Sequence, residues 1–275
     1  MNTESIVALN PSPGNSSLGA AQRRNEARRI TAIASGKGGV GKTWLAITLS
    51  HALARAGQRV LLFDGDLGLA NVDIQLGLMP EQDLGAVVAS GADVGAAVTH
   101  VDSTGFDVIA GKSGSGALSS LTRQEVASLR QGVLDIAPRY DDVIVDIGAG
   151  IDTTQLVLAS IGGTVLVVVT DEPTSLTDAY AFIKVANRLT PRPDMRVVVN
   201  MASSRTEGER TYGTLKRACE SFLKFSPPLA GIIRRDAKVK DAIRYQTPFL
   251  TRHPNADAAA DVEALAGQLA KATPA

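Results

Sequence analysis

From residue 30 onward, short apolar runs rich in Val, Ile and Leu alternate with longer amphipathic segments of helical periodicity. The runs expected to form strands are Ile30–Ser35, Arg59–Asp64, Phe106–Ala110, Asp142–Ile147, Thr164–Thr170, Met195–Asn200 and Leu229–Ile233. The segments expected to form helices are Lys42–Ala56, Thr122–Ala137, Thr153–Ile161, Thr174–Leu189, Glu207–Lys224 and Ala237–Tyr245. Strands that are apolar throughout are buried on both faces. The pattern therefore predicts an α/β fold, a doubly wound, mostly parallel sheet with helices on both faces.

The first 29 residues do not share this pattern. Residues 1–20 are rich in Asn, Ser, Pro and Gly and are expected to form a flexible tail. Residues 22–29 carry four Arg against one Glu, as a solvated helix or linker would. We expect residues 30–275 to form a single domain, because no linker interrupts the alternation.

Composition and charge narrow the class of protein. The chain has 275 residues, with 28 Lys and Arg against 28 Asp and Glu, so overall basicity gives no reason to expect nucleic acid. There is a single cysteine, Cys219, which excludes an internal disulfide and is expected to be buried. The longest apolar run is too short to span a membrane, and no signal peptide pattern precedes it. These features predict a cytoplasmic protein.

A glycine-rich segment follows the first expected strand. Residues 36–43 read Gly-Lys-Gly-Gly-Val-Gly-Lys-Thr, which fits the pattern G-x4-G-K-[ST] of a phosphate-binding P-loop. Glycines let successive backbone N–H groups converge on phosphate oxygens, and the positive end of the next helix points there too. Lys42 would reach the β- and γ-phosphates, and the Thr43 hydroxyl would bind Mg²⁺. The residues expected to contact nucleotide here are Gly36, Lys37, Gly38, Gly39, Val40, Gly41, Lys42, Thr43 and Trp44.

The same glycines allow a rival interpretation. Gly36, Gly38 and Gly41 also fit G-x-G-x-x-G, and Asp64 closes the next strand, as in a dinucleotide-binding unit. Against this, Lys42 and Thr43 directly follow the last glycine, and further acids stand at positions 66 and 146. Mg²⁺–triphosphate chemistry uses such residues, whereas a nicotinamide site does not. We therefore expect ATP with Mg²⁺.

Three acids are candidates to complete the site. Asp64 and Asp146 close expected parallel strands, whose carboxyl ends meet at one edge of the sheet. We expect both carboxylates to hold water molecules bound to Mg²⁺, with Thr43 as a direct ligand. Asp66 would orient the attacking water, although Asp-Gly-Asp also suits a simple turn. The loop after Asp146, with Gly148 and Asp152, is either a nucleotide-dependent switch or an ordinary strand-to-helix turn.

The second lysine of the loop, Lys37, resembles the deviant Walker A motif of the MinD/ParA family. The resemblance implies an ATP-dependent homodimer in which Lys37 reaches the partner's phosphates. Catalysis would then depend on Lys37, Lys42 and Asp66. Residues 61–78 and 146–151 resemble the two switches of the family's FlhG/FleN branch, which implies control of flagellar number or placement.

Further segments are similar to the nucleotide-base side of that branch. Residues 170–184, which contain Pro173, and residues 197–201, which contain Asn200, match the segments that lie beside the base in the family. Ile233 and Arg234 fall in another such segment, where the family usually has Pro in place of Arg234. The lone cysteine disfavours the iron–sulfur and zinc-clamped relatives.

Two segments bear on the partners of the protein: one departs from the pattern of this branch, and the other lacks the features of a membrane-binding helix. Residues 18–24 lack the Asp-Gln-Ala motif with which the branch engages a GTPase, which leaves stimulation of a flagellar GTPase or binding of an assembly partner open. Residues 257–271 have no aromatic anchor and only one Lys, so we expect a helix packed on the domain and no direct membrane binding.

A basic cluster leaves a second function open. It comprises Arg234, Arg235, Lys238, Lys240 and Arg244. These residues form either a solvated helix face or a patch that binds DNA without sequence specificity. The second interpretation would make the protein a ParA-like ATPase that partitions DNA or positions another cargo. A third possibility is a metabolic ATP-dependent synthetase on the same fold, but the sequence shows no site for its substrate.

The flagellar interpretation also bears on location. It implies that the protein, in the cytoplasm, is recruited to a cell pole or to another partner site.

Overall fold

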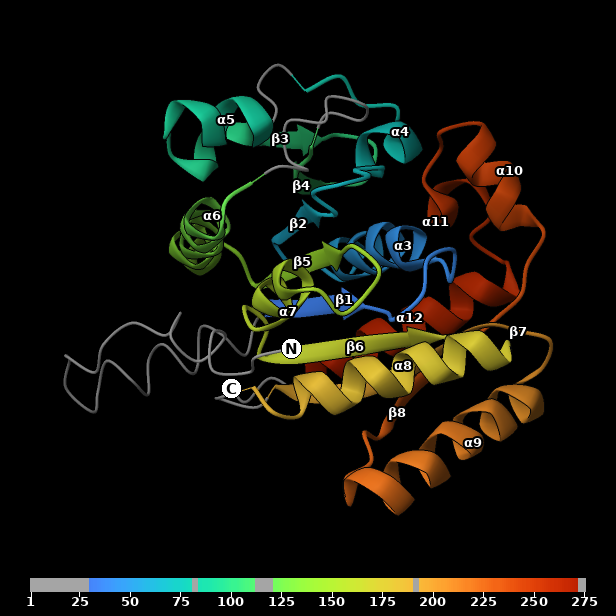
Figure 1. Ribbon diagram of the computed structural model, residues 1–275. Helices are drawn as coiled ribbons and strands as arrows, with labels where there is room; N and C mark the ends of the chain where they lie inside the picture. The colour runs from blue at the N-terminus through green and yellow to red at the C-terminus, as the bar shows by residue number, and fades with distance from the viewer. Residues whose placement is uncertain (1–29, 81–83, 112–120, 190–192, 272–275) are drawn as a thin grey trace.

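The computed structural model describes residues 30–80, 84–111, 121–189 and 193–271, in which eight strands form one sheet (Figure 1). The strands are β1 (Ile30–Ala34), β2 (Val60–Gly65), β3 (Val98–Val101), β4 (Phe106–Ile109), β5 (Asp142–Ile147), β6 (Thr164–Val169), β7 (Asp194–Ala202) and β8 (Leu229–Arg234). Their order is β3-β4-β2-β5-β1-β6-β7-β8. β3 is antiparallel to β4, and the other neighbouring pairs are parallel. The expected doubly wound, mostly parallel sheet is therefore confirmed.

Helices cover both faces of the sheet. They are α3 (Lys42–Arg55), α4 (Val72–Leu76), α5 (Leu84–Ser90), α6 (Arg123–Ile136), α7 (Thr153–Ala159), α8 (Pro173–Ala186), α9 (Arg205–Leu223), α10 (Lys238–Arg244), α11 (Phe249–Arg252) and α12 (Asp257–Lys271). Two short 3₁₀ turns, Val94–Ala97 and Ala137–Arg139, complete the described elements. Helices α7, α8 and α9 lie on one side of the sheet, and α3 and α12 lie on the other.

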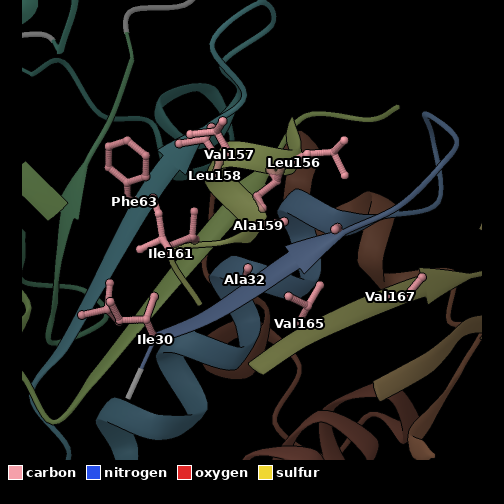
Figure 2. Close-up of a cluster of buried hydrophobic side chains, with 14 of the residues drawn as sticks. Ile30, Ala32, Phe63, Leu156, Val157, Leu158, Ala159, Ile161, Val165 and Val167 are labelled. Carbon is pink, nitrogen blue, oxygen red and sulfur yellow. The ribbon is translucent and has the colours of Figure 1, made fainter. Parts of the chain in front are cut away.

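Successive residues of a strand point into two separate hydrophobic cores, one on each face of the sheet. On β2, Leu61 and Phe63 point into one core, while Leu62 points into the other. The first core also takes β1 and β6 side chains, which pack against α7 around Leu158, as Figure 2 shows. The second core lies between the sheet and α3 with α12. Because both faces are covered, the central strands are apolar over most of their length, which is the pattern seen in the sequence.

Every strand and helix expected from the sequence is present, within a few residues at each end. The elements that were not expected are β3, α4, α5 and α11, and none is longer than seven residues. The only antiparallel pair in the described sheet, β3 with β4, is a hairpin that turns through Gly105 at φ 72°. The N-terminal tail and basic segment, residues 1–29, lie outside the described residues.

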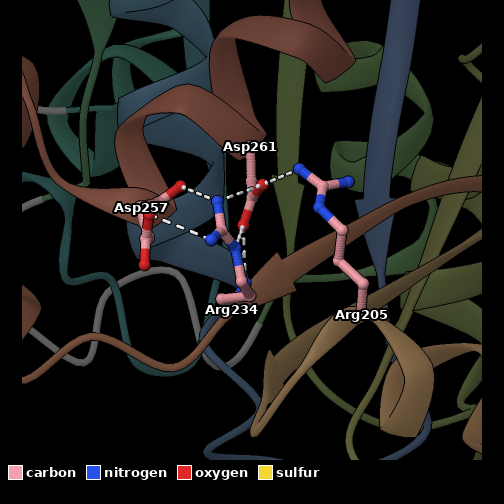
Figure 3. A network of polar contacts seen from close by, with 4 residues as sticks. All are labelled: Arg205, Arg234, Asp257 and Asp261. Atoms are coloured by element: carbon pink, nitrogen blue, oxygen red, sulfur yellow. Dashed lines mark hydrogen bonds and ion pairs between the residues drawn. The ribbon is translucent and has the colours of Figure 1, made fainter.

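The C-terminal helix is fixed by a buried carboxylate. Asp261 on α12 is fully buried and binds the side chains of Arg205 on α9 and Arg234 on β8 (Figure 3). Arg234 reaches it with Nε at 2.8 Å and Nη2 at 3.1 Å, and its backbone N–H donates at 3.0 Å. Asp257 adds a second, exposed ion pair to Arg234. The expectation that this helix packs on the domain is confirmed.

Two further expectations concern Cys219 and membrane spanning. Cys219 on α9 is buried, as expected, and burial raises the pKa of its thiol to about 11. Within the described ranges, no helix is both long enough and apolar enough to span a membrane.

The ion pairs of Asp261 with Arg205 and Arg234, which we call the Asp261 clamp, lead to a prediction about stability. Replacement of Asp261 by Ala leaves the Arg234 guanidinium without its main partner, so we expect the free energy of unfolding to fall by about 2–4 kcal/mol. Urea denaturation followed by circular dichroism measures the loss. Arg205→Ala is the matched control and should lower the same quantity by at most about 1 kcal/mol, because this side chain is mostly exposed. Equal losses in the two variants would contradict the clamp.

Candidate nucleotide-binding site

The glycine-rich loop connects β1 to α3 at the point where the strand order of the sheet reverses. In such sheets ligands bind at the carboxyl ends of the strands, beside this reversal. Gly39 and Gly41 have φ of 79° and 86°, in the left-handed region that side chains other than glycine rarely adopt. The backbone at these positions therefore requires glycine, and the loop curls tightly before α3 begins.

Crowding explains two of the loop glycines. A Cβ at Gly36 would lie 2.1 Å from the backbone oxygen of Asp178 on α8. At Gly41 it would lie 2.5 Å from Nδ2 of Asn200, whose amide donates to the Val40 carbonyl at 2.8 Å. The loop is thus held against α8 and the end of β7, with no room for a side chain at Gly36 or Gly41.

The start of α3 is suited to an anion. Among the residues that the structure describes, no side chain caps this helix, and its first turn contains no acid. Its first-turn N–H groups therefore carry the positive end of the helix dipole toward the loop. Lys42, the first residue of the helix, is buried, and burial lowers the pKa of its ammonium group, whereas Asp146 and Asp66 oppose that shift. A phosphate group bound at the loop would compensate this desolvated cation.

Two buried carboxylates lie at the ends of adjacent strands, and one of them, Asp146, interacts with this lysine. Asp64 on β2 and Asp146 on β5 are register partners, and each side chain is almost completely buried. Burial is the main cause that raises the pKa of each carboxyl to about 7, and for Asp64 the neighbouring Asp146 charge contributes to the same rise. Asp64 accepts N–H groups from Asp66, Asn71 and Val72, each at 3.2 Å, which lower its pKa in part.

These groups fit a magnesium ion. Oδ1 of Asp146 is buried and has no hydrogen-bond partner among the described residues. A hydrogen bond from Thr43 lowers the pKa of the same carboxyl. Hydroxyl and carboxylate oxygens are the donors that Mg²⁺ prefers. Thr43, Asp64 and Asp146 would therefore hold it, the two acids through water, and a bound Mg²⁺ neutralises phosphate charge during hydrolysis.

The two loops expected to act as switches lie against each other. Oδ1 of Asp66 accepts the Leu69 N–H at 3.1 Å, and it would lie 3.0 Å from a Cβ placed on Gly148. Gly150 donates its N–H to the carbonyl of Ser35, just before the glycine-rich loop, at 3.1 Å. Asp152 immediately precedes α7 without capping it through its side chain. The arrangement couples both loops to the phosphate site, and their switch roles stay predictions.

Lys37 has partners within its own chain that the sequence did not indicate. Its ammonium group forms an ion pair with Glu172 and donates to Oγ1 of Thr174 at 2.7 Å. These two residues flank Pro173 at the start of α8. No local pattern signals the contact, because 135 residues separate Lys37 from Glu172. In the described structure, Lys37 is thus held beside the phosphate site by its contacts with the segment that contains Pro173.

The remaining candidates use their side chains elsewhere. The Trp44 indole packs edge-on against Phe249, with ring centroids 5.3 Å apart, and Ile233 is buried in the core under α3. The Arg234 guanidinium is occupied by Asp257 and Asp261. Any nucleotide contact of Trp44 or Ile233 would have to come from the backbone. The assignments of Trp44, Pro173, Asn200, Ile233 and Arg234 to nucleotide binding stay predictions.

A glycine-rich loop before an uncapped helix, a buried lysine and paired buried acids together define a P-loop nucleotide-binding fold. Residues 31–249 match the family model described as the CobQ/CobB/MinD/ParA nucleotide binding domain, and the chain belongs to this family. The expectation of an ATPase that uses ATP with Mg²⁺ is thereby confirmed, and the dinucleotide interpretation is set aside.

Individual relatives agree with this family. The chain is 37% identical to the antiactivator FleN of Pseudomonas aeruginosa over 238 residues, which cover 86% of this chain and 85% of that protein. It is 28% identical to the flagellum site-determining protein YlxH of Helicobacter pylori, covering 88% and 81% of the two chains. The solved structure of the cell division ATPase MinD from Pyrococcus furiosus is similar with a TM-score of 0.76 and 24% identity, covering 89% of this chain and 99% of that one.

The paired acids predict a pH-dependent gain in stability when one of them is neutralised. With a folded pKa of about 7 against an ordinary value of 3.8, Asp146 binds more protons in the folded state, so stability falls as pH rises between these values. Asp146→Asn should therefore raise the melting temperature of the nucleotide-free protein at pH 8 by about 2–5 °C. The gain should shrink toward pH 4. Calorimetric scans over this range measure it.

A matched control is Asp102→Asn, since the Asp102 side chain is fully exposed. It should not change the melting temperature at pH 8 by more than about 1 °C. A variant at Asp146 that melts lower than the parent at pH 8 would show that the carboxylate stabilises the nucleotide-free protein.

Proposed function

We propose that this protein is an ATP-dependent dimerisation switch that limits the number of flagella or fixes their placement. The observation that carries the proposal is its likeness to the antiactivator FleN over nearly the whole of both chains. The likeness to the flagellum site-determining protein YlxH supports the same process. The buried acids and the adjoining loops supply the nucleotide-sensing part of such a switch.

In this proposal, different residues of the chain bind ATP, position the attacking water and stabilise the dimer. Lys42 and the first-turn N–H groups of α3 bind the β- and γ-phosphates. Asp66 orients the attacking water after releasing the N–H of Leu69. Lys37 leaves Glu172 and Thr174 and reaches the nucleotide of a second copy, which stabilises the dimer. Hydrolysis then removes the γ-phosphate, and the dimer separates.

Partner and location belong to the same proposal. The dimer would recruit a flagellar GTPase or assembly partner in the cytoplasm and act at a cell pole or another partner site. The MinC:MinD complex of Aquifex aeolicus, similar with a TM-score of 0.71 and 25% identity, is an example of a MinD relative bound to another protein. Residues 18–24, which lack the Asp-Gln-Ala motif, lie outside the described residues.

A second candidate function is partition of DNA or another cargo. It rests on the exposed cations Lys238, Lys240 and Arg244 of α10. Arg234 does not contribute, because its side chain is held by two carboxylates. If this function holds, ATP-dependent DNA binding falls steeply with salt and is lost when Lys238 and Lys240 are replaced by Gln.

Lys42 provides the first prediction from this function. Lys42→Ala should weaken ATP binding about 100-fold or more, because the buried cation that meets the phosphates is removed. Isothermal titration calorimetry with Mg²⁺ present measures the affinity. Lys271→Ala, at an exposed position of α12, is the control and should bind ATP as the parent does. Unchanged affinity in the Lys42 variant would refute the phosphate-site assignment.

Lys37 and Glu172 provide a paired prediction. Lys37→Ala should shift ATP-dependent dimerisation to protein concentrations about 10-fold higher or more, because the cross-dimer cation is lost. Glu172→Gln removes the charged one of the two partners that Lys37 has within the chain, and it should leave dimerisation equal to or stronger than that of the parent. Analytical ultracentrifugation with a slowly hydrolysed ATP analogue tests both. A normal dimer for the Lys37 variant would contradict its role.

The biological proposal is tested in the organism that carries this chain. Deletion of the coding sequence should change the number or position of flagella counted by electron microscopy. Complementation with the parent should restore the pattern, whereas Lys42→Ala at equal protein level should not. Normal flagella in the deletion strain, together with defective inheritance of DNA, would favour the partition function.

A further inference from the structure

A small hollow lies between α3, α4, α10 and α11, outside the phosphate site. Its lining includes Trp44 from α3, Gln75 and Leu76 from α4, Ile243 from α10 and Phe249 from α11. Beside it, a hydrogen bond joins α4 to the segment between α10 and α11, since Nε2 of Gln246 donates to the Ile74 carbonyl at 2.8 Å. The hollow is therefore a built feature of the fold.

Exposed apolar side chains stand on the elements around this hollow. Ile74 on α4 is 51% exposed and Tyr245, directly after α10, is 57% exposed. Ile243, which lines the hollow, is also exposed. Apolar surface that gathers on neighbouring elements, around a depression, is typical of protein interaction sites. We call Ile74, Ile243, Tyr245 and the hollow the α4–α10 patch.

Tyr245 is held in place although it is exposed. The Arg252 guanidinium lies 4.2 Å from the centre of its ring, a cation–π contact. Asp241 in turn binds Arg252 at 2.6 Å and His253 at 2.9 Å. An exposed aromatic ring that is already oriented loses little entropy on binding, which is a property of residues that dominate interface energies.

The charge beside the patch is positive. Lys238, Lys240 and Arg244 on α10 are exposed, and in the described part of the chain they form no ion pair. The acid of the same helix, Asp241, is taken up by Arg252 and His253. A complementary partner therefore carries acids beside apolar side chains. The chain's own N-terminal basic segment, residues 22–29, has the wrong charge for this surface.

We propose that the α4–α10 patch binds an acidic amphipathic helix of a partner protein, whose apolar side chains cover Ile243 and Tyr245. The acids of that helix would pair with the cations of α10. The buried indole N–H of Trp44 has no hydrogen-bond partner among the described residues. Because Trp44 lines the hollow, a helix bound over the patch would change the surroundings of this indole. Duplex DNA matches the cations but leaves the apolar side chains and the hollow unused.

The patch is also connected to the phosphate site. Trp44 directly follows Thr43 in α3, and α4 begins where the backbone N–H groups of Asn71 and Val72 bind the Asp64 carboxylate. A change at Asp64 when nucleotide binds would move α4 and alter the hollow. This coupling rests on the proposed function, whereas the existence of the patch does not.

The experiment uses a native reporter, because Trp44 is the only tryptophan of the chain. The full-length protein is labelled with ¹⁵N and titrated, without nucleotide, with a designed helical peptide that has Leu along one face and Glu elsewhere. We expect the indole N–H signal to shift with a dissociation constant of about 10–100 μM. A peptide of the same composition with scattered Leu, and one with Lys in place of Glu, should bind at least about 10-fold more weakly.

Variants locate the binding. The double variant with Ile243→Ser and Tyr245→Ala should weaken the peptide about 10-fold or more, and so should Lys238→Glu with Lys240→Glu. Phe222→Ser is the matched control, since Phe222 is equally apolar and 77% exposed, but lies on α9. It should stay within about twofold of the parent. Melting curves confirm that each variant is folded.

Several results would overturn the proposal. These are an unmoved indole signal at about 1 mM peptide, equal binding of the control peptides, or an equal loss with Phe222→Ser. A stronger indole shift with a 30-base-pair DNA duplex or with phosphatidylglycerol vesicles would assign the surface to those ligands instead. If the peptide binds equally with and without Mg²⁺–ATP while calorimetry shows that ATP is bound, the coupling is wrong and the patch stands. If ATP itself does not bind, the proposed function fails.

Discussion

The site depends on two carboxylates that the sheet forces out of water. Because β2 and β5 are adjacent and parallel, Asp64 and Asp146 end up as buried register partners, and Asp146 interacts with the buried Lys42. One buried cation cannot stabilise two buried anions, so burial shifts both acids toward their protonated forms. The charges of the protein alone therefore do not balance at this site. Phosphate and a divalent cation, which bring both signs of charge, are the ligands that complete it.

The parts of the fold that could be predicted are those encoded locally. Uniformly apolar runs reveal strands covered on both faces, and the spacing of glycines, lysine and threonine reveals the loop. The strand β3 is not predicted because it has four residues, of which one is buried, and these are too few to show a clear period. The turn residues Asp102–Gly105 between two apolar runs were the available sign of its hairpin with β4. Helices as short as α4 are fixed by tertiary contacts, such as those of Asp64 with their first N–H groups.

The candidate site divides in the same way. The loop, Thr43 and the two strand-end acids follow from motif and topology, since parallel strands bring their carboxyl ends together. The partners of Lys37 and Arg234 do not, because each contact joins segments that only the finished fold brings together. Arg234 illustrates the difference. In the sequence it is one cation of a basic cluster, whereas in the fold it belongs to the buried Asp261 on a helix packed across β8.

The position of Cys219 has a practical consequence. Its thiol is buried on α9 and its pKa is about 11, so at neutral pH it is neither ionised nor accessible. Thiolate is the reactive form toward maleimides, peroxide and disulfides. In the folded state the protein therefore behaves chemically as though it had no cysteine. A single cysteine introduced at the surface can carry a fluorophore or spin label without removal of the native one, and oxidants should not change the behaviour of the ATPase through this residue.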